Sequence, residues 1–307
     1  MAETPAEVTD TSAAIPAIPT EAPAEETAAA TMAEEIVKRE ALGIRELVEA
    51  GCHFGHQTRR WNPRMKRFLF GERNGVHIID LDQTLPRFRE ALEFLRETTA
   101  SGGKVLFVST KRQAQEIVES EARRSRQYYV NRRWLGGMLT NFKTVRKSID
   151  RYKELLELVA DEEQVSELSK KELSRINRQI EKYSKSLDGM KEMTRLPDAL
   201  FVIDVNREAI GVIEANRLGI PVIAIVDSNC NPDQVDLVVP GNDDSLRAIQ
   251  LYAERVADAC LEGAEIHNAR LQAQAPQEDG AKADEKPGTG RVVVEIQQPE
   301  PRQRRSR

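Results

Sequence analysis

Short apolar runs that alternate with longer amphipathic segments dominate the middle of this chain. Most of these runs lack the polar–apolar alternation of a half-exposed strand, so they indicate strands buried on both faces of a sheet. Strands alternating with helices of this length imply right-handed βαβ crossovers, and the sequence therefore predicts a Rossmann-like, doubly wound α/β domain with a mostly parallel sheet. The predicted strands are Val76–Ile79, Val105–Val108, Leu200–Val205, Val222–Val226 and Leu237–Val239, and the predicted helices are Ile44–Ala50, Leu85–Thr98, Ala114–Arg124, Glu208–Leu218 and Ser245–Gly263.

Residues 141–190 interrupt this rhythm with two narrow apolar stripes at heptad spacing. A polar break near Asp161–Glu163 separates the stripes, and two heptad stretches joined by a short polar turn predict an antiparallel coiled-coil hairpin. We therefore predict an α/β domain formed by 38–140 and 191–267, with the hairpin 141–190 as an insertion. The stripe residues are Val145, Ile149, Tyr152, Leu156 and Val159, followed by Leu173, Ile176, Ile180, Tyr183 and Leu187.

The two ends of the chain differ from its middle in composition. Residues 1–37 contain eight acidic residues and no Lys or Arg, and residues 268–307 are rich in Gln, Pro, Gly and charge. Segments with so few large apolar residues cannot bury enough surface to offset the entropy of ordering them. We predict a disordered acidic tail at 1–37, pointing outward or touching a protein, and a disordered tail at 268–307. Its basic end, Arg302–Arg307, either stays solvated or touches RNA.

The sequence gives no sign of a membrane or secretory protein. It contains no apolar stretch of about 18 residues, and its first residues lack the pattern of a signal peptide. Cys52, Cys230 and Cys260 are odd in number and too far apart for the spacing of a zinc knuckle. We therefore predict a cytoplasmic protein with reduced thiols and no membrane partner.

A doubly wound sheet invites a search for an enzyme site, and the usual phosphate loops are missing. Neither G-x-G-x-x-G nor G-x-x-x-x-G-K-[ST] occurs. The passage Ser109–Arg112, between a predicted strand and helix, could hold an anion at a helix N-terminus, but it lacks glycines. A nucleotide- or sugar-phosphate-binding enzyme that uses Ser109, Asp204 and Asp227 is therefore the alternative, and we expect no catalytic residue and no cofactor.

A few side chains leave a metal site open as a second interpretation. His53 and His56 lie three residues apart, although Gly55 weakens a helix there and no Cys pair adds ligands nearby. Asp204 and Asp227 end predicted strands, and Asp243-Asp244 begins a helix, which is where α/β enzymes place acids, bases or metal ligands. The simpler interpretation is that the histidines are hydrogen-bonded or face RNA, and that Asp227 and Asp243 cap helices or bind turn amides. We expect no metal.

Two basic segments, each containing one tryptophan, give a stronger signal. Six basic residues face one acidic residue from Arg59 to Arg73, and eleven face four from Lys111 to Arg151. Such clusters attract phosphate even though the net charge is -5, and an aromatic ring among arginines can stack on a base. A single basic segment is a solvated face more often than a binding site, but the two segments together, each with a tryptophan, favour nucleic acid. The predicted RNA contacts are Arg59, Arg60, Trp61, Lys66, Arg67, Arg73, Lys111, Arg112, Arg132, Arg133, Trp134, Asn141, Lys143, Arg146 and Lys147.

Blocks of residues at these same places resemble bacterial small-subunit ribosomal protein two, the S-two family. The blocks occur in the family's order and span about residues 41–262, so they are specific together although no single one is. They are His53-Phe54-Gly55-His56-Gln57-Thr58 with Trp61-Asn62-Pro63, Val76-His77-Ile78-Ile79-Asp80-Leu81, Arg133-Trp134-Leu135-Gly136-Gly137-Met138-Leu139-Thr140-Asn141, Leu196-Pro197-Asp198-Ala199-Leu200-Phe201-Val202-Ile203-Asp204, Asn216-Arg217-Leu218-Gly219-Ile220-Pro221 and Pro240-Gly241-Asn242-Asp243-Asp244.

The resemblance implies a structural protein of the small ribosomal subunit rather than an enzyme. It implies an α/β domain with a protruding coiled-coil hairpin, bound to small-subunit ribosomal RNA at the junction of head and body. Members of the family also help to anchor ribosomal protein one, which captures messenger RNA. On the matched positions we expect eight residues at or near RNA, although both tryptophans could equally anchor the fold: Arg60, Trp61, Lys66, Arg133, Trp134, Gly137, Asn141 and Lys143. The tails at 1–37 and 268–307 depart from the family's pattern, so no partner is inferred for them.

Overall fold

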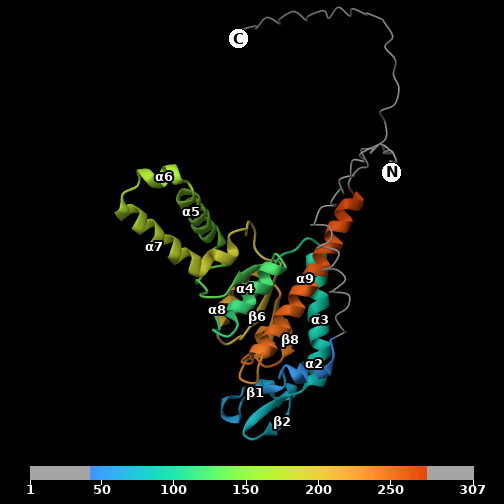
Figure 1. Cartoon of the computed structure of the whole chain (residues 1–307). Helices are drawn as coiled ribbons and strands as arrows, with labels where there is room; N and C mark the ends of the chain where they lie inside the picture. Colours follow the sequence, from blue (N-terminus) through green and yellow to red (C-terminus); the bar gives the residue numbers. More distant parts are fainter. Residues whose placement is uncertain (1–41, 275–307) are drawn as a thin grey trace, which may run out of the picture.

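The computed structural model describes residues 42–274, which form a five-stranded sheet with helices on both faces (Figure 1). The strands are β4 (Val105–Val108), β5 (Tyr128–Val130), β6 (Ala199–Ile203), β7 (Val222–Val226) and β8 (Leu237–Pro240). They lie in the order β5-β4-β6-β7-β8, and every neighbouring pair is parallel. The predicted Rossmann-like α/β fold is confirmed. The predicted tail at 1–37 and most of that at 268–307 lie outside the described residues.

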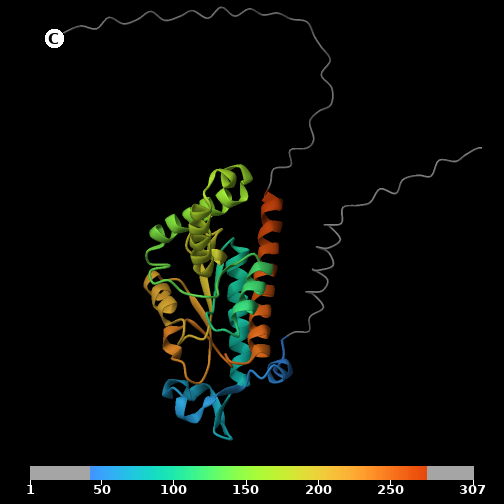
Figure 2. The same cartoon turned by 60° about the vertical axis from the view of Figure 1, so that its left-hand side comes forward.

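Alternate residues of the buried strands enter two separate cores. Phe107 and Phe201 point toward α3 (Leu81–Ala100), α4 (Gln115–Arg124) and α9 (Leu246–Gln274), and their rings meet edge to face with centroids 5.4 Å apart. Leu106 and Val202 point to the other face, where α8 (Ala209–Leu218) and the segment between β5 and β6 pack. Figure 2 shows the sheet between these layers. Burial on both faces explains why the strands read as continuous apolar runs.

One predicted strand belongs to a different sheet. Val76–Ile79 was expected with the strands of the parallel sheet, but as β3 it pairs antiparallel with β1 (Phe54–Gln57) and β2 (Leu69–Arg73). The cause is the turn Asn74-Gly75, where both residues have positive φ (53° and 74°). Two such residues favour a tight hairpin, so β2 leads directly into β3. This small sheet and α2 (Ile44–Glu49) lie at one end of the molecule, at the bottom of Figure 1.

Several predicted helices are present with different ends. The Asp80 side chain accepts a hydrogen bond from the Asp82 amide at 3.1 Å, so α3 begins at Leu81 and holds Pro86 inside the helix. The last helix, α9, continues to Gln274 instead of ending at Gly263. Gly263 sits where α9 crosses α3, because an added Cβ would lie 1.9 Å from Thr99 Oγ1. The glycine therefore permits close helix packing and does not end the helix.

The insertion contains α5 (Phe142–Ala160), α6 (Glu162–Glu167) and α7 (Lys170–Leu187), and it projects from the α/β body (Figure 1). A short helix therefore occupies the predicted polar turn, and Ser169 and Glu172 form a capping box at the start of α7. The rings of Tyr152 and Tyr183 lie 6.0 Å apart across the α5–α7 contact. That the two helices wind around each other as a coiled coil stays a prediction.

The base of the insertion is fixed to the sheet. Ile149, Tyr152 and Leu155 of α5 are buried, and the first two belong to the same core as the strands. The Asp188 carboxylate accepts hydrogen bonds from the Tyr129 hydroxyl at 3.0 Å and the Tyr152 hydroxyl at 3.3 Å. It also accepts one from Arg123 at 3.0 Å and forms an ion pair with Lys191 at 2.7 Å. These contacts join α4, β5, α5 and the end of α7 at one carboxylate.

Within residues 42–274, no helix combines the length and the apolar character that crossing a membrane requires.

Candidate nucleic-acid interface

Two buried residues, Met65 and Phe68, attach the first basic segment to the body. It contains two short 3-10 helices, Thr58–Arg60 and Pro63–Phe68, and the Asn62 side chain caps the second by accepting from the Arg64 amide at 3.0 Å. Met65 and Phe68 are buried in the core that faces α8. The basic side chains between and before these anchors are therefore directed to solvent. Arg59, Arg60, Lys66 and Arg67 are all exposed.

Trp61 and Arg73 lie beside this segment in different settings. The Trp61 ring is 5.2 Å from the His77 ring and remains 36% exposed, so one part of it packs while another stays open to a partner. Arg73 is exposed at the end of β2, next to the Asn74-Gly75 turn. It lines an apolar pocket and lies outside the two 3-10 helices that carry the other basic side chains of this segment.

Most of the predicted RNA contacts of the second basic segment, Lys111–Arg151, lie between the end of β5 and the first turns of α5. Arg132, Arg133 and Lys143 are exposed, and so are Arg146 and Lys147 on the first turns of α5. The helix has no acidic residue in its first turn, although the positive end of a helix dipole favours acidic groups there. Basic residues at this end concentrate positive charge, which suits phosphate. Asn141, at the N-cap, is also exposed and accepts from the Thr144 hydroxyl at 2.9 Å.

Trp134 points into the protein. Its indole Nε1 donates to Glu214 Oε1 at 3.1 Å, and its six-membered ring lies against Gly211 of α8. It is half-buried and packs against the core that contains Met138 and Leu139. The two basic segments are thus anchored in one core, on the α8 side of the sheet.

The structure corrects the predicted place of Lys111, which does not lie on the surface. It is 6% exposed, and its Nζ is 2.8 Å from Asp243 Oδ1 and 2.6 Å from Asp244 Oδ1. Burial alone would lower the pKa of Lys111, but the surrounding carboxylates outweigh it and hold the pKa above its ordinary value. The loop after β4 places this side chain beside Asp204, which follows β6, and beside Asp243 and Asp244, which follow β8, and it is their counter-ion. Its neighbour Arg112 is exposed.

Asp227, predicted at a strand end, and Asp243-Asp244, predicted at a helix start, gather with one histidine. His56 Nδ1 is 3.0 Å from Asp227 Oδ2, and the Asp227 carboxylate raises the pKa of His56 to about 8 despite burial. Burial and the neighbouring Asp227 and Asp204 raise the pKa of Asp243 to about 7. One ligand atom from each of His56, Asp227, Asp243 and Asp244 lies within 4.8 Å of the others, a set that could hold a divalent cation. His53, the other histidine considered, lies outside this group.

The predicted anion passage at Ser109–Arg112 is occupied by the protein's own carboxylate. Glu208 Oε1 accepts from both the amide and the hydroxyl of Thr110 at 2.6 Å. Arg207 Nε in turn donates to the Thr110 hydroxyl at 2.9 Å. A phosphate at this amide would have to displace a buried, hydrogen-bonded Glu208. The arrangement therefore disfavours the nucleotide-enzyme interpretation.

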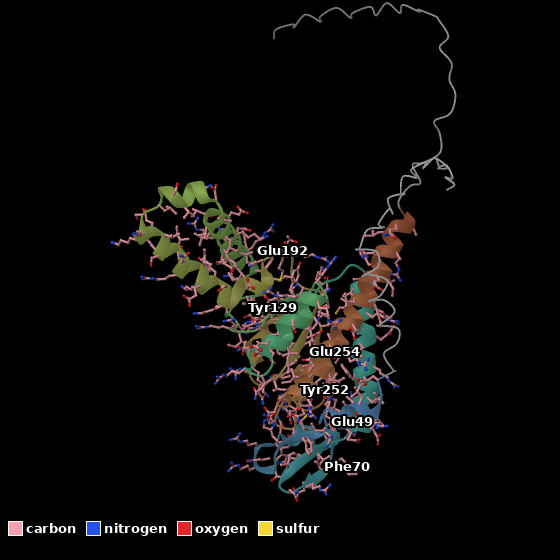
Figure 3. The ribbon with its side chains drawn as sticks, viewed as in Figure 1. Glu49, Phe70, Tyr129, Glu192, Tyr252 and Glu254 are labelled. Atoms are coloured by element: carbon pink, nitrogen blue, oxygen red, sulfur yellow. The ribbon has the colours of Figure 1, made fainter. Side chains whose placement is uncertain are left out.

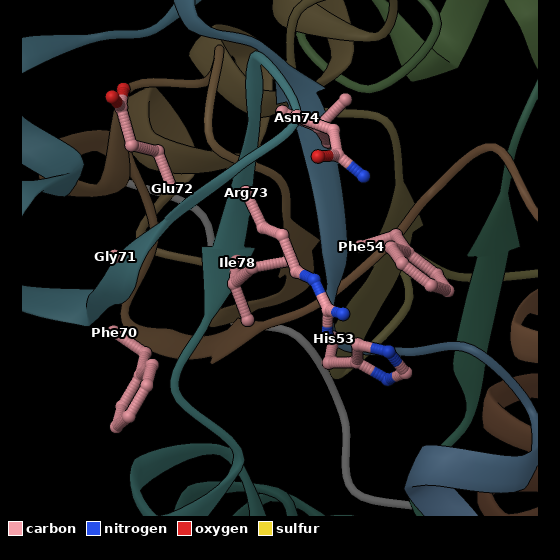
Figure 4. A pocket seen from close by; sticks show the side chains of 9 residues that line it. His53, Phe54, Phe70, Gly71, Glu72, Arg73, Asn74 and Ile78 are labelled. Atoms are coloured by element: carbon pink, nitrogen blue, oxygen red, sulfur yellow. The ribbon is translucent and has the colours of Figure 1, made fainter.

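An apolar pocket on the small sheet was not predicted. It has a volume of about 650 Å³, and His53, Phe54, Phe70 and Ile78 contribute to its lining (Figure 4). Phe70, near the start of β2, is 81% exposed and points away from the body (Figure 3). Grouped exposed aromatic residues are typical of surfaces that bind proteins, membranes or small ligands. The sequence signal was the Asn74-Gly75 turn, which predicts a hairpin and so a free strand face.

Comparison with known proteins identifies the family of this chain. The family model described as Ribosomal protein S2 matches residues 47–263.

The chain belongs to the ribosomal protein S2 family. A protein of Solibacter usitatus is 57% identical over 223 residues, which cover 73% of this chain and 74% of that protein. One of Pseudoalteromonas translucida is 56% identical over 243 residues, covering 79% of this chain and 99% of the relative. One of Mesorhizobium japonicum is 56% identical over 222 residues, covering 72% and 85%. All three are named small ribosomal subunit protein uS2. Every predicted RNA contact lies in the part that the ribosomal protein S2 model matches.

Proposed function

We propose that this chain is a structural constituent of the small ribosomal subunit in the cytoplasm and binds small-subunit ribosomal RNA without catalysing a reaction. Membership of the ribosomal protein S2 family carries the proposal. The two basic segments support RNA as the partner, because Met65, Phe68, Met138 and Leu139 anchor them in the core while most of their basic side chains are exposed to solvent, where they can meet phosphates. We call their exposed residues the basic surface: Arg59, Arg60, Trp61, Lys66, Arg67, Arg73, Arg112, Arg132, Arg133, Asn141, Lys143, Arg146 and Lys147.

Fractionation of a cell lysate on a sucrose gradient tests this function. The full chain is expected to sediment with the small subunit in low salt and to leave it in high salt, because binding that releases counterions weakens steeply with ionic strength. A soluble protein of similar size should remain at the top of the gradient in both conditions. If the chain sediments free of ribosomal RNA in low salt, the proposed function is wrong.

We also infer that the chain contacts neighbouring small-subunit proteins, including ribosomal protein one. The exposed Phe54 and Phe70 beside the apolar pocket support a protein partner at this end of the molecule. The helical insertion offers a second surface for a protein neighbour, since its outer faces are densely charged and project from the body. In this proposal RNA meets the basic surface, and proteins meet the apolar pocket and the insertion.

Shortening the insertion separates these two roles. The base must stay, because Ile149, Tyr152 and Leu187 belong to the core of the sheet. Replacing residues 158–175 with a short Gly-Ser turn is expected to leave affinity for small-subunit RNA within about threefold, since the phosphate contacts of the basic surface remain. Filter binding at several salt concentrations measures this, with the unaltered chain as control. A loss of a hundredfold would place the main RNA contacts on the distal insertion instead.

The enzyme alternative is not favoured. Relatives at 56–57% identity are named as ribosomal subunit proteins, and at the strand ends Lys111 is paired with Asp243 and Thr110 with Glu208.

A further inference from the structure

Five hydrogen-bond donors of one loop converge on a single carboxylate. Glu214 Oε1 accepts from the Trp134 indole at 3.1 Å and from the Gly137 amide at 2.8 Å. Glu214 Oε2 accepts from the amides of Leu139 and Thr140 at 3.0 and 3.1 Å, and from the Thr140 hydroxyl at 3.1 Å. A carboxylate has about four lone-pair sites, so this one is fully used. The side chain comes from α8, more than seventy residues further along the chain.

This contact is internal to the protein. Glu214 is 5% exposed, and the neighbouring Gly211 leaves room for the Trp134 ring, which an added Cβ would approach to 3.3 Å. Burial alone would raise the pKa of Glu214, but the hydrogen bonds from Thr140, Trp134, Gly137 and Leu139 outweigh it and lower the pKa below its ordinary value. The group therefore stays ionised at neutral pH, and each donor bond is charge-assisted.

The loop Trp134–Thr140, which we call the clamped loop because Glu214 binds it, lies between the most basic parts of the surface. Arg132 and Arg133 immediately precede Trp134, and Asn141 and Lys143 immediately follow Thr140. The loop has little regular structure, and Gly137 adopts a φ of +83°. Its conformation therefore depends on what its amides bind, and four of its donor residues bind Glu214. Basic groups fixed at both ends of a rigid loop meet phosphates at less entropic cost than groups on a mobile one.

We infer that Glu214 is a positioning residue of the basic surface: it holds the loop Trp134–Thr140 on α8, and so sets the places of Arg133 and Lys143 without touching RNA. The inference rests on the proposed function. A buried acidic residue thus contributes to the binding of negatively charged RNA, and an inspection of surface charge alone would not find it. The carboxylate acts only through the donors that it gathers.

The variant Glu214→Gln tests the inference. Glutamine offers one acceptor oxygen, and its amide group would face the loop's own N–H groups, so the clamp must open. Affinity for small-subunit ribosomal RNA in filter binding is expected to fall about tenfold, and the salt dependence to become shallower by about one phosphate contact. Glu93→Gln is the matched control, because it removes the same charge from an exposed position on α3. Equal affinity of a folded Glu214→Gln and of Glu93→Gln would overturn the inference.

A spectroscopic measurement distinguishes positioning from a general loss of structure. The chain has two tryptophans, so Trp61→Phe leaves Trp134 as the only one, and this background is used for fluorescence alone. Adding Glu214→Gln should shift the Trp134 emission to longer wavelength while the circular dichroism of the sheet and helices is retained. Without that substitution the same shift should appear only as the pH falls below 4.5, because the depressed pKa keeps the clamp intact above that value.

A milder variant covers the case in which Glu214→Gln does not fold. Thr140→Val keeps the shape of the side chain and removes one of the five donors, and it should weaken RNA binding about threefold. Full RNA affinity of Thr140→Val together with an unshifted Trp134 emission would contradict the inference. The proposed function fails in a different way, since the unaltered chain would then show no salt-dependent affinity for ribosomal RNA at all.

Discussion

Replacing Arg132, Arg133, Lys143 and Arg146 together with alanine is expected to lower the affinity for small-subunit ribosomal RNA about a hundredfold. All four side chains are exposed on either side of the clamped loop. If each meets one phosphate, the slope of log affinity against log salt should become shallower by about three. The protein should stay folded, because exposed substitutions of this kind change stability by about 0.5 kcal/mol or less each.

The chain offers a matched control for this variant. Lys171, Arg175, Arg178 and Lys182 are equally exposed on α7, and replacing them with alanine removes the same charge from the insertion. Filter binding at several salt concentrations and incorporation into small subunits, measured on gradients, compare the two. Equal losses would mean that RNA responds to total charge, and the assignment of the basic surface would then be wrong.

Replacing Lys111 with alanine is expected to reduce the free energy of unfolding by about 3 kcal/mol, because breaking a buried ion pair leaves charge without compensation. Its ammonium is the counter-ion of Asp243 and Asp244, and Asp204 lies 3.8 Å away. Urea unfolding followed by circular dichroism gives the change. The expected effect on RNA affinity of the folded variant is small, since Lys111 does not face solvent.

Arg112 is the natural control for Lys111. The two residues are adjacent and carry the same charge, but Arg112 is exposed. Arg112→Ala should leave stability unchanged to within about 0.5 kcal/mol and weaken RNA binding modestly. The opposite pattern, a stable Lys111→Ala with poor RNA binding, would restore the original sequence-based prediction for Lys111.

Much of the fold could be predicted because strand and helix periodicities are local. The runs at Val105–Val108 and Val222–Val226 are strands with the predicted bounds. The strand Tyr128–Val130 was missed because three residues carry too little pattern, and Val76–Ile79 was placed in the wrong sheet because pairing partners are not local information.

The candidate site divides in the same way. Met65 and Phe68 are buried and the basic residues from Arg59 to Arg67 are exposed, a division between apolar and basic side chains that the sequence already shows. The pairing of Lys111 with Asp243 joins residues 132 positions apart, and nothing local distinguishes Lys111 from Arg112. Glu214 was missed for the same reason, although an acidic residue among the buried Gly211, Val212 and Ala215 of one helix was a signal that it has an internal partner.

The attachment of the insertion has a mechanical consequence. Gly189 leaves no space at this joint, because an added Cβ would lie 2.1 Å from the Tyr129 carbonyl oxygen of β5. Asp188 is bonded to four residues, and Ile149 and Tyr152 in the middle of α5 are buried in the core, so the projecting helices are held rigidly at their base. A force applied at the tip therefore reaches β5 and the neighbouring strands directly. A partner that binds the distal end of the insertion therefore restrains the orientation of the whole α/β body.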